Sequence, residues 1–159
     1  HTCDRMPTAP TLAANWKFPS RRRTPTTFLR GIGYALVSPF TSRRTFAVAD
    51  YQVTVPARSL FARILAKYQA YEAINSNWII SEFRGTTGGL FVDVGANFGW
   101  YSMLTARLAP DATVIAVEPS RENFSLLTHN IASNRFTNIV PSNLGAGATA
   151  TEASLYVHE

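Results

Sequence analysis

Residues 91–101 (FVDVGANFGWY) constrain the fold of this 159-residue chain more than any other segment. Residues 90–94 form a continuous apolar run with one acid, which is typical of a β-strand buried on both faces. Gly95 and Gly99 follow, and Tyr101, Leu104 and Leu108 then recur at the spacing of one helix face. The segment therefore predicts a strand, a glycine turn and a helix. In an open parallel sheet, ligands bind beyond the carboxyl ends of the strands, which is where this turn would lie.

The surrounding residues continue the alternation of strands and helices. Gly85 and Gly88 predict the turn before residue 90, and Ser120 is a helix cap. Strands that alternate with helices of this length pair in parallel through right-handed crossovers, so the predicted fold class is α/β. We expect strands over 50–56, 90–94, 113–117 and 139–140, with 153–157 as a candidate further strand. We expect helices over 59–83 (with a second short helix after 75–77), 97–108 and 120–134.

Charge divides the chain unevenly. Residues 1–60 carry a net charge of +7 and residues 61–159 carry −2. We expect residues 1–49 to be a basic, Pro- and Thr-rich, poorly ordered segment, and residues 50–159 to form the folded domain. A solvated arm is favoured over a nucleic-acid or membrane partner. The apolar run over 28–40 resembles a secretion signal, but Arg30 interrupts it and Pro39 closes it.

Composition excludes several classes. The length favours one domain, and 46% apolar residues argue against disorder of the whole chain. The single cysteine, Cys3, excludes an intramolecular disulfide and a cysteine-based zinc site, and the three histidines have no metal-ligand spacing. The sequence contains no run of 18 apolar residues, so it predicts no membrane-spanning helix. We expect a cytoplasmic protein.

Three ligand templates compete for the glycine turn. A nicotinamide site requires Gly-x-Gly-x-x-Gly, and a phosphate loop requires Gly-Lys-Ser/Thr; the sequence has neither. The third template, acid-x-Gly-x-Asn-x-Gly with an acid closing the next strand, fits at Asp93 and Glu118 and indicates S-adenosylmethionine. Asp93 would repel a pyrophosphate but suits a cationic ligand. The two oxygens of Glu118 suit the two hydroxyls of a ribose.

Local chemistry assigns expected roles around the turn. Gly95 allows a positive φ, Asn97 tolerates a left-handed conformation, and free N–H groups at the helix start are expected to face the ligand. Trp100 and Tyr101 are equally suited to line a pocket or to pack in the core. Two further candidates are weaker: Asn143 near the adenine, and His129, for which a structural role is favoured because it has no evident partner. The sequence identifies no catalytic base.

Residues 88–134 resemble the FkbM family of S-adenosylmethionine-dependent methyltransferases. The matching residues are 91–102, 116–119, Asn130-Ile131 and Asn134, with Tyr71-Glu72 as a similar lead-in. The resemblance implies a Rossmann-like methyltransferase fold and O-methylation of a sugar or secondary-metabolite hydroxyl, so the acceptor would be a small molecule or glycan and not a specific nucleic acid. The cofactor-binding residues that we expect are Asp93, Gly95, Ala96, Asn97, Phe98 and Gly99, around the methionine, and Glu118 with Pro119, at the ribose.

The sequence departs from the family in its length. The family has a seven-stranded sheet, and this chain ends soon after the predicted third strand, so we expect a C-terminally truncated fragment. The strand over 90–94 would lack a partner on one edge, which leaves backbone groups unsatisfied. We therefore expect cofactor contacts without methyl transfer by the chain alone. The alternative is a non-catalytic α/β domain that binds an adenosine-containing ligand or a protein partner.

Overall fold

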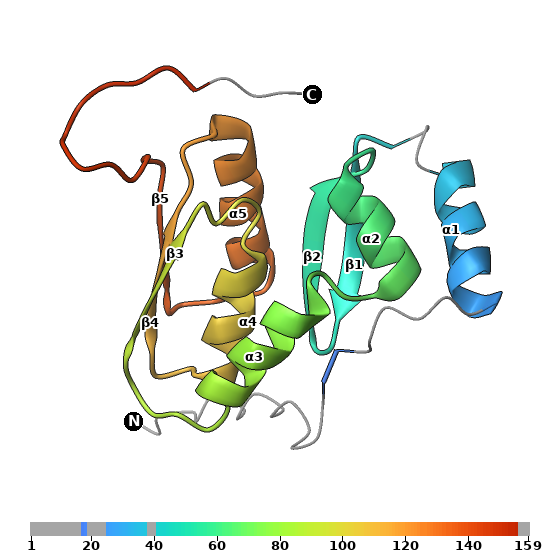
Figure 1. Cartoon of the computed structure of the whole chain (residues 1–159), viewed down its shortest axis with the longest axis horizontal. Helices are drawn as coiled ribbons and strands as arrows, with labels where there is room; N and C mark the ends of the chain where they lie inside the picture. The colour runs from blue at the N-terminus through green and yellow to red at the C-terminus, as the bar shows by residue number, and fades with distance from the viewer. Residues whose placement is uncertain (1–16, 19–24, 38–40, 156–159) are drawn as a thin grey trace, which may run out of the picture.

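A computed structural model describes residues 17–18, 25–37 and 41–155. Its centre is a three-stranded parallel sheet of β3 (Leu90–Val94), β4 (Thr113–Val117) and β5 (Ile139–Ser142), in the spatial order β3-β4-β5. Helix α4 (Trp100–Leu108) joins β3 to β4, and α5 (Arg121–Ser133) joins β4 to β5. Figure 1 shows both helices on the same side of this sheet. The predicted α/β class, the parallel pairing and these five elements are confirmed.

Local signals mark the starts of α4 and α5, although α4 begins at Trp100, three residues later than expected. Helix α4 follows Gly99, which has a positive φ of 91°, and α5 begins after Ser120, whose side chain accepts a hydrogen bond from the Asn123 N–H at 3.4 Å. Strand β5 is two residues longer than expected, and no strand forms over the described residues 153–155. The rest of that predicted strand lies outside the described residues.

A second sheet lies on the other side of α4 and α5. It is an antiparallel hairpin of β1 (Arg43–Val48) and β2 (Tyr51–Pro56). Helix α2 (Leu60–Tyr68) covers the far side of the hairpin, and α1 (Pro25–Val37) packs on α2 (Figure 1). Helix α1 and strand β1 both lie within the segment 1–49, and the hairpin crosses the predicted boundary at residue 49 because β1 pairs with β2.

Two asparagines attach this hairpin to α5. The Asn130 Oδ1 accepts from the Thr54 N–H at 2.8 Å, and its Nδ2 donates to the Thr54 carbonyl at 2.9 Å. Asn134 makes the same pair of bonds to the backbone of Gln52, at 2.8 and 2.7 Å. The two side chains are four residues apart and share one helix face, so together they replace a neighbouring strand along the outer edge of β2.

The predicted helix over 59–83 is two helices, and its break is earlier than expected. Helix α2 ends at Gln69, which adopts a left-handed conformation with φ 53°, and α3 (Ala73–Phe83) begins after Glu72. Ser76 lies inside α3, buried, where its hydroxyl donates to the Tyr71 carbonyl at 2.7 Å. The Asn75-Ser76-Asn77 run therefore does not break the helix, because its hydroxyl and amide groups find partners within it and its surroundings.

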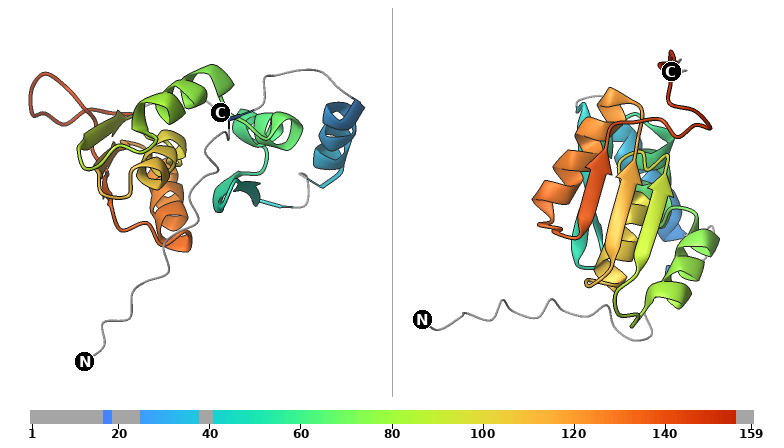
Figure 2. Two further views of the ribbon diagram at one scale, coloured as in Figure 1. Left: turned by 90° about the horizontal axis from the view of Figure 1, so that it is seen from below. Right: turned by 90° about the vertical axis from the view of Figure 1, so that its left-hand side faces the viewer.

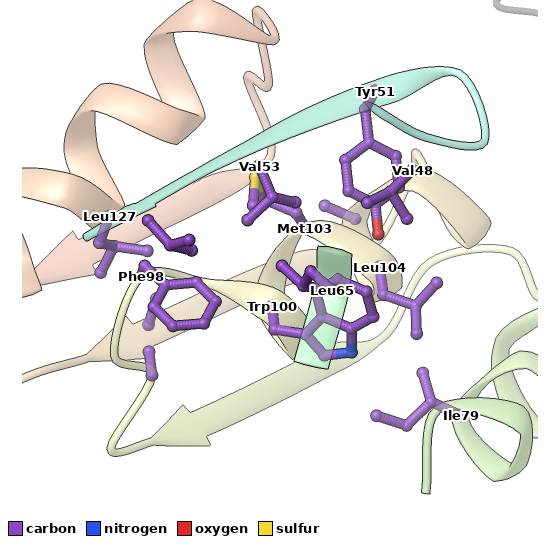
Figure 3. Packing of buried hydrophobic residues seen from close by; sticks show 14 of the residues in the cluster. Val48, Tyr51, Val53, Leu65, Ile79, Phe98, Trp100, Met103, Leu104 and Leu127 are labelled. Carbon is purple, nitrogen blue, oxygen red and sulfur yellow. The ribbon is translucent and has the colours of Figure 1, made fainter. Parts of the chain in front are cut away.

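The hydrophobic core fills the space between the two sheets. Figure 3 shows Phe98, Met103, Leu104 and Leu127 from the loop, α4 and α5 packed against Val53 of the hairpin. All five side chains are almost completely buried. The core thus fixes the position of the glycine turn, because Phe98 anchors the turn from inside.

The opposite face of the parallel sheet is open. Leu90, Val92, Val94 and Val140 are 62, 49, 61 and 52% exposed, and the right-hand view of Figure 2 looks directly onto their strands with α4 and α5 behind. The prediction that residues 90–94 are buried on both faces is wrong, because no described element covers this face. No described strand pairs with the outer edge of β3 either.

Candidate functional site

The turn between β3 and α4 has three residues with positive φ. Gly95, Asn97 and Gly99 have φ angles of 79, 53 and 91°. A Cβ on Gly99 would lie 2.6 Å from the Leu127 Cδ1, so both the torsion and the packing against α5 require glycine there. A Cβ on Gly95 would meet nothing within 4 Å. Gly95 therefore satisfies the torsion and leaves open space beside the turn.

The N–H groups of four residues in the turn donate hydrogen bonds to acceptors within the protein. Those of Gly95 and Ala96 both donate to the Val117 carbonyl, at 2.8 and 2.9 Å, and that of Gly99 donates to the Ala96 carbonyl at 2.8 Å. The Asn97 N–H donates to the Glu118 Oε2 at 2.7 Å. The expectation that N–H groups here face a ligand is wrong for these four residues, because the end of β4 and the turn itself supply their acceptors. Such a turn is poorly suited to cradle a phosphate, which needs free donors.

Glu118 lies at the tip of β4 and organises the turn. Its Oε2 accepts from Asn97, and its Oε1 accepts from the Ser120 N–H at 2.9 Å. The residue is 5% exposed. A carboxylate has about four lone-pair positions, so two remain beyond these bonds. Pro119, the next residue, is exposed.

Asp93 is the second carboxylate of the site. It is buried on β3, and its Oδ2 accepts a hydrogen bond from the Ser102 hydroxyl of α4 at 2.6 Å. Burial raises the pKa of Asp93, the bonds to Ser102 partly oppose this, and the negative charge of Glu118 adds to the rise. A cation bound beside Asp93 and Glu118 would stabilise the charged form of each carboxylate. It would thereby offset the desolvation of Asp93 and the repulsion between the two negative charges.

Three predicted side chains point into the core. Ala96 and Phe98 are buried, and the Phe98 ring packs edge-to-face on Phe61 with centroids 4.4 Å apart. Trp100 is also buried in the core (Figure 3), and its indole N–H donates to the Ser76 hydroxyl at 2.9 Å. At Ala96 and Phe98, only backbone atoms are thus placed to contact a ligand.

The remaining candidates occupy the margin of the site. The half-buried Tyr101 donates its hydroxyl to Glu72 at the start of α3, which links α3 to α4. Asn143 donates to the Glu118 carbonyl at 2.8 Å and to the Pro119 carbonyl at 3.2 Å, so its amide supports the end of β4. His129 is exposed on α5, 3.5 Å from the Ser133 hydroxyl.

Two residues that bear on the site lie in the segments that resemble the FkbM family, but the sequence assigned neither of them a role. Ser102 donates to Asp93 from nine residues further along the chain, and that contact depends on the folded turn between them. Asn130, 1% exposed, also donates to the Phe98 carbonyl at 2.9 Å, so it joins the glycine turn to β2. Its position four residues before Asn134 on one helix face was the available signal.

Across the described ranges, no group of three or more His, Cys, Asp or Glu side chains is arranged to hold a metal ion. In the same part of the chain, no helix has the length and hydropathy needed to cross a membrane.

Comparison with known proteins gives likeness in structure alone. No family model matches the sequence, and no curated protein matches it. Among solved structures, TYW2 from P. horikoshii, in complex with MeSAdo, has a TM-score of 0.50 at 19% identity, over 65% of this chain and 36% of that protein. The tRNA m1G37 methyltransferase from M. jannaschii gives 0.48 at 18%, over 65 and 31%. Precorrin-6y C5,15-methyltransferase from Geobacter metallireducens gives 0.42 at 16%, over 47 and 40%.

The chain thus spans between 31 and 40% of the length of these three proteins. Nothing among the comparisons points to the FkbM family in particular. Together with the β3-β4-β5 order and the glycine turn, the likeness shows that the chain has the α/β, Rossmann-like fold of class I methyltransferases.

Proposed function

We propose that the turn over residues 95–99 and the tip of β4 bind S-adenosylmethionine, and that the chain belongs to a methyltransferase. One observation carries the proposal: the space beside Gly95 is open, and the turn lies between two acids, Asp93 on β3 and Glu118 at the tip of the adjacent β4. Two acids and few free N–H donors fit a cationic nucleoside and not a pyrophosphate. A protein of the same fold has been crystallised with MeSAdo, which supports a nucleoside at such a site.

Each residue of the site would contact a different part of the cofactor. Glu118 uses its remaining lone pairs for the ribose hydroxyls, and Pro119 borders it. Asp93 provides negative charge near the methionine end. Gly95, Ala96, Asn97, Phe98 and Gly99 supply backbone surface, since Ala96 and Phe98 have their side chains in the core.

The proposed reaction is O-methylation of a sugar or secondary-metabolite hydroxyl, as the likeness of residues 88–134 to the FkbM family implies. When bound, the cofactor would supply an activated methyl group for the acceptor hydroxyl, with Glu118 holding its ribose and Asp93 lying near its methionine end. The turn contributes by alignment, because a fixed donor and acceptor react faster than free ones. No described residue is assigned as the base.

We expect the chain alone to bind the cofactor without robust methyl transfer. The face and the outer edge of β3 are uncovered in the described residues, so nothing there encloses an acceptor beside the turn. Incubation with labelled cofactor and pooled hydroxylated acceptors tests this. Robust turnover by this chain would contradict it.

Calorimetry with S-adenosylhomocysteine tests the site directly. Glu118→Gln keeps the shape but removes the charge and half of the acceptors, and we expect about tenfold weaker binding, because a charge-assisted hydrogen bond contributes about 1.5–3 kcal/mol. Glu122→Gln on the first turn of α5 is the matched control, since it changes the net charge equally at an exposed residue. Equal affinities for both variants would remove Glu118 from the site.

A second candidate function is a non-catalytic domain that binds an adenosine-containing ligand or a protein partner. The exposed apolar residues on β3 favour the protein partner, because soluble domains rarely leave such faces bare. Cofactor binding separates the two candidates: a chain that folds and does not bind S-adenosylhomocysteine supports the second.

A further inference from the structure

We propose a second binding site, for an oxyanion carried on an apolar body, in the hollow between α1, β1 and α2. The hollow encloses about 360 Å³. Its polar lining comes from Arg30 and Tyr34 of α1, Arg44 of β1, and Gln69 at the end of α2. None of these residues belongs to the candidate cofactor site, so the proposal stands independently of the proposed function.

Arg44 is the centre of this site. Its guanidinium carbon lies 5.4 Å from the centroid of the Tyr34 ring and 5.5 Å from that of Phe46, so two aromatic rings hold the group in place. Its Nη1 is buried and has no hydrogen-bond partner among the described residues. Arg44 is half-buried and lines the hollow, and the fold leaves one of its donors without an acceptor, so an anion in the hollow would supply negative charge that the described fold does not.

Other cations near Arg44 make the electrostatic potential in the hollow more positive. Arg30 lines the same hollow, and no carboxylate lines it within the described part of the chain. A neighbouring hollow that also touches Tyr34 has Arg63 and Lys67 in its lining, again with no described acid. The acid of the β1–β2 turn, Asp50, does not neutralise them, because it pairs with Arg107 of α4. The potential in this region is therefore positive from several sides.

The other walls of the hollow are apolar and indicate which group the oxyanion would be attached to. Phe46, Val48, Leu65 and Ala66 give the hollow an apolar wall beside the cations. A guanidinium pairs with the two oxygens of a carboxylate or phosphate at once. The ligand class that suits both surfaces is therefore a carboxylate or phosphate attached to an aromatic or aliphatic group.

The site is separated from the glycine turn by the middle layer of the molecule. In Figure 1, α1 and the hairpin lie on one side of α4 and α5, and the β3–β4–β5 sheet lies on the other. A ligand held between α1 and β1 would fix α1 against the hairpin. In the present structure, the Tyr34 hydroxyl bond to the Ala57 carbonyl contributes to that contact.

Calorimetry at constant ionic strength tests the site with three probes: phenyl phosphate, benzoate and neutral phenol. We expect weak, saturable binding of at least one anion, with a Kd of about 1 mM, and no binding of phenol. Phenyl phosphate and benzoate distinguish the two oxyanions. We expect Arg44→Gln to weaken binding about tenfold, whereas Arg43→Gln, which removes the same charge from an exposed neighbour on β1 outside this hollow, leaves affinity within about twofold.

Two results would overturn the proposal. One is saturable binding by neither anion. The other is equal weakening by Arg44→Gln and Arg43→Gln, which would mean that net charge alone attracts the probe. If Arg44→Gln does not fold, Arg30→Gln replaces it, because Arg30 is exposed on α1 and lines the same hollow; unchanged affinity in that variant would also contradict the site.

Discussion

On one face of the parallel sheet, Asp93, Val114 and Ala116 are buried under α4 and α5, whereas on the other face Leu90, Val92 and Val94 are exposed. The strands themselves are apolar on both faces, so composition does not explain the difference. What differs is the cover: both crossover helices lie on one side (Figure 2). The covered face therefore stabilises the fold and shapes the glycine turn, whereas the bare face contributes little to the stability of the described residues.

The largest effect is expected at the glycine that faces the covered side. Gly99→Ala places a Cβ 2.6 Å from Leu127 at a φ of 91°, and we expect a loss of about 3 kcal/mol or more in the free energy of unfolding. Gly95→Ala, at φ 79° with open space around it, adds only backbone strain, about 1–2 kcal/mol. Urea unfolding measures both, and equal losses would show that packing under α5 does not set the difference.

The attachment of α5 to the hairpin gives the next effect. Asn130→Ala removes three buried hydrogen bonds, one of them to the Phe98 carbonyl in the turn, and we expect a loss of about 2–3 kcal/mol. Asn134→Ala removes the matching bonds to Gln52 at a more exposed position, and we expect about 1 kcal/mol. Thermal unfolding compares the two variants.

Binding of S-adenosylhomocysteine extends the same comparison. Only Asn130 reaches the turn, so its variant is expected to lose affinity while the Asn134 variant keeps it. An Asn134 variant that loses as much affinity would show that the hairpin as a whole, and not the bond to Phe98, supports the turn.

Matched substitutions on the two faces test the comparison itself. Val114→Thr buries a hydroxyl on the covered face, and we expect a loss of about 2 kcal/mol. Val92→Thr makes the same change at a residue that is 49% exposed, and we expect a change within about 0.5 kcal/mol. Both are read from urea unfolding at low protein concentration. A large loss for Val92→Thr would mean that the bare face is covered in solution.

The smallest expected effect is the pH dependence of stability that Asp93, the buried acid under α4, contributes. Burial raises the pKa of Asp93 in the folded state above its ordinary value of 3.8. The folded state therefore holds this proton at pH values where the unfolded state has lost it, so the contribution of Asp93 to stability falls as the pH rises from 3.8 to the folded pKa. We expect Asp93→Asn to gain stability relative to the natural chain across that window, and a pH-independent difference between the two would contradict the raised pKa.

The sequence predicted the part of the fold that depends on local signals. The strand over 90–94, the glycine turn and the Ser120 cap each depend on residues within a few positions, and parallel pairing follows from alternating strands and helices. The positions of Asp93 and Glu118 at adjacent strand tips follow from the same alternation. Their partners do not, because the bonds from Ser102 and from the N–H of Asn97 depend on the folded turn.

The rest depended on distant contacts. Strand β2 is held at Thr54 and Gln52 by asparagines 76 and 82 residues later, which no local pattern reveals. The sequence did not predict helix α1 and strand β1, because their segment has few periodic signals. Both elements pack on later parts of the chain, α1 on α2 and β1 on β2. The bare face could not be foreseen from residues 90–94 alone, since the run of apolar residues is the same whether or not a helix covers it.

An amide NMR titration of the chain with S-adenosylhomocysteine tests the proposed nucleoside site. We expect saturable shifts of the amide signals of Gly95 and Gly99 in the turn and of Asn143 beside the tip of β4, with no change at Gly31 and Gly33 on α1. Saturable shifts confined to α1 and the hairpin, or no shifts in a chain whose spectrum is that of a folded protein, would contradict a nucleoside site at the turn between β3 and α4.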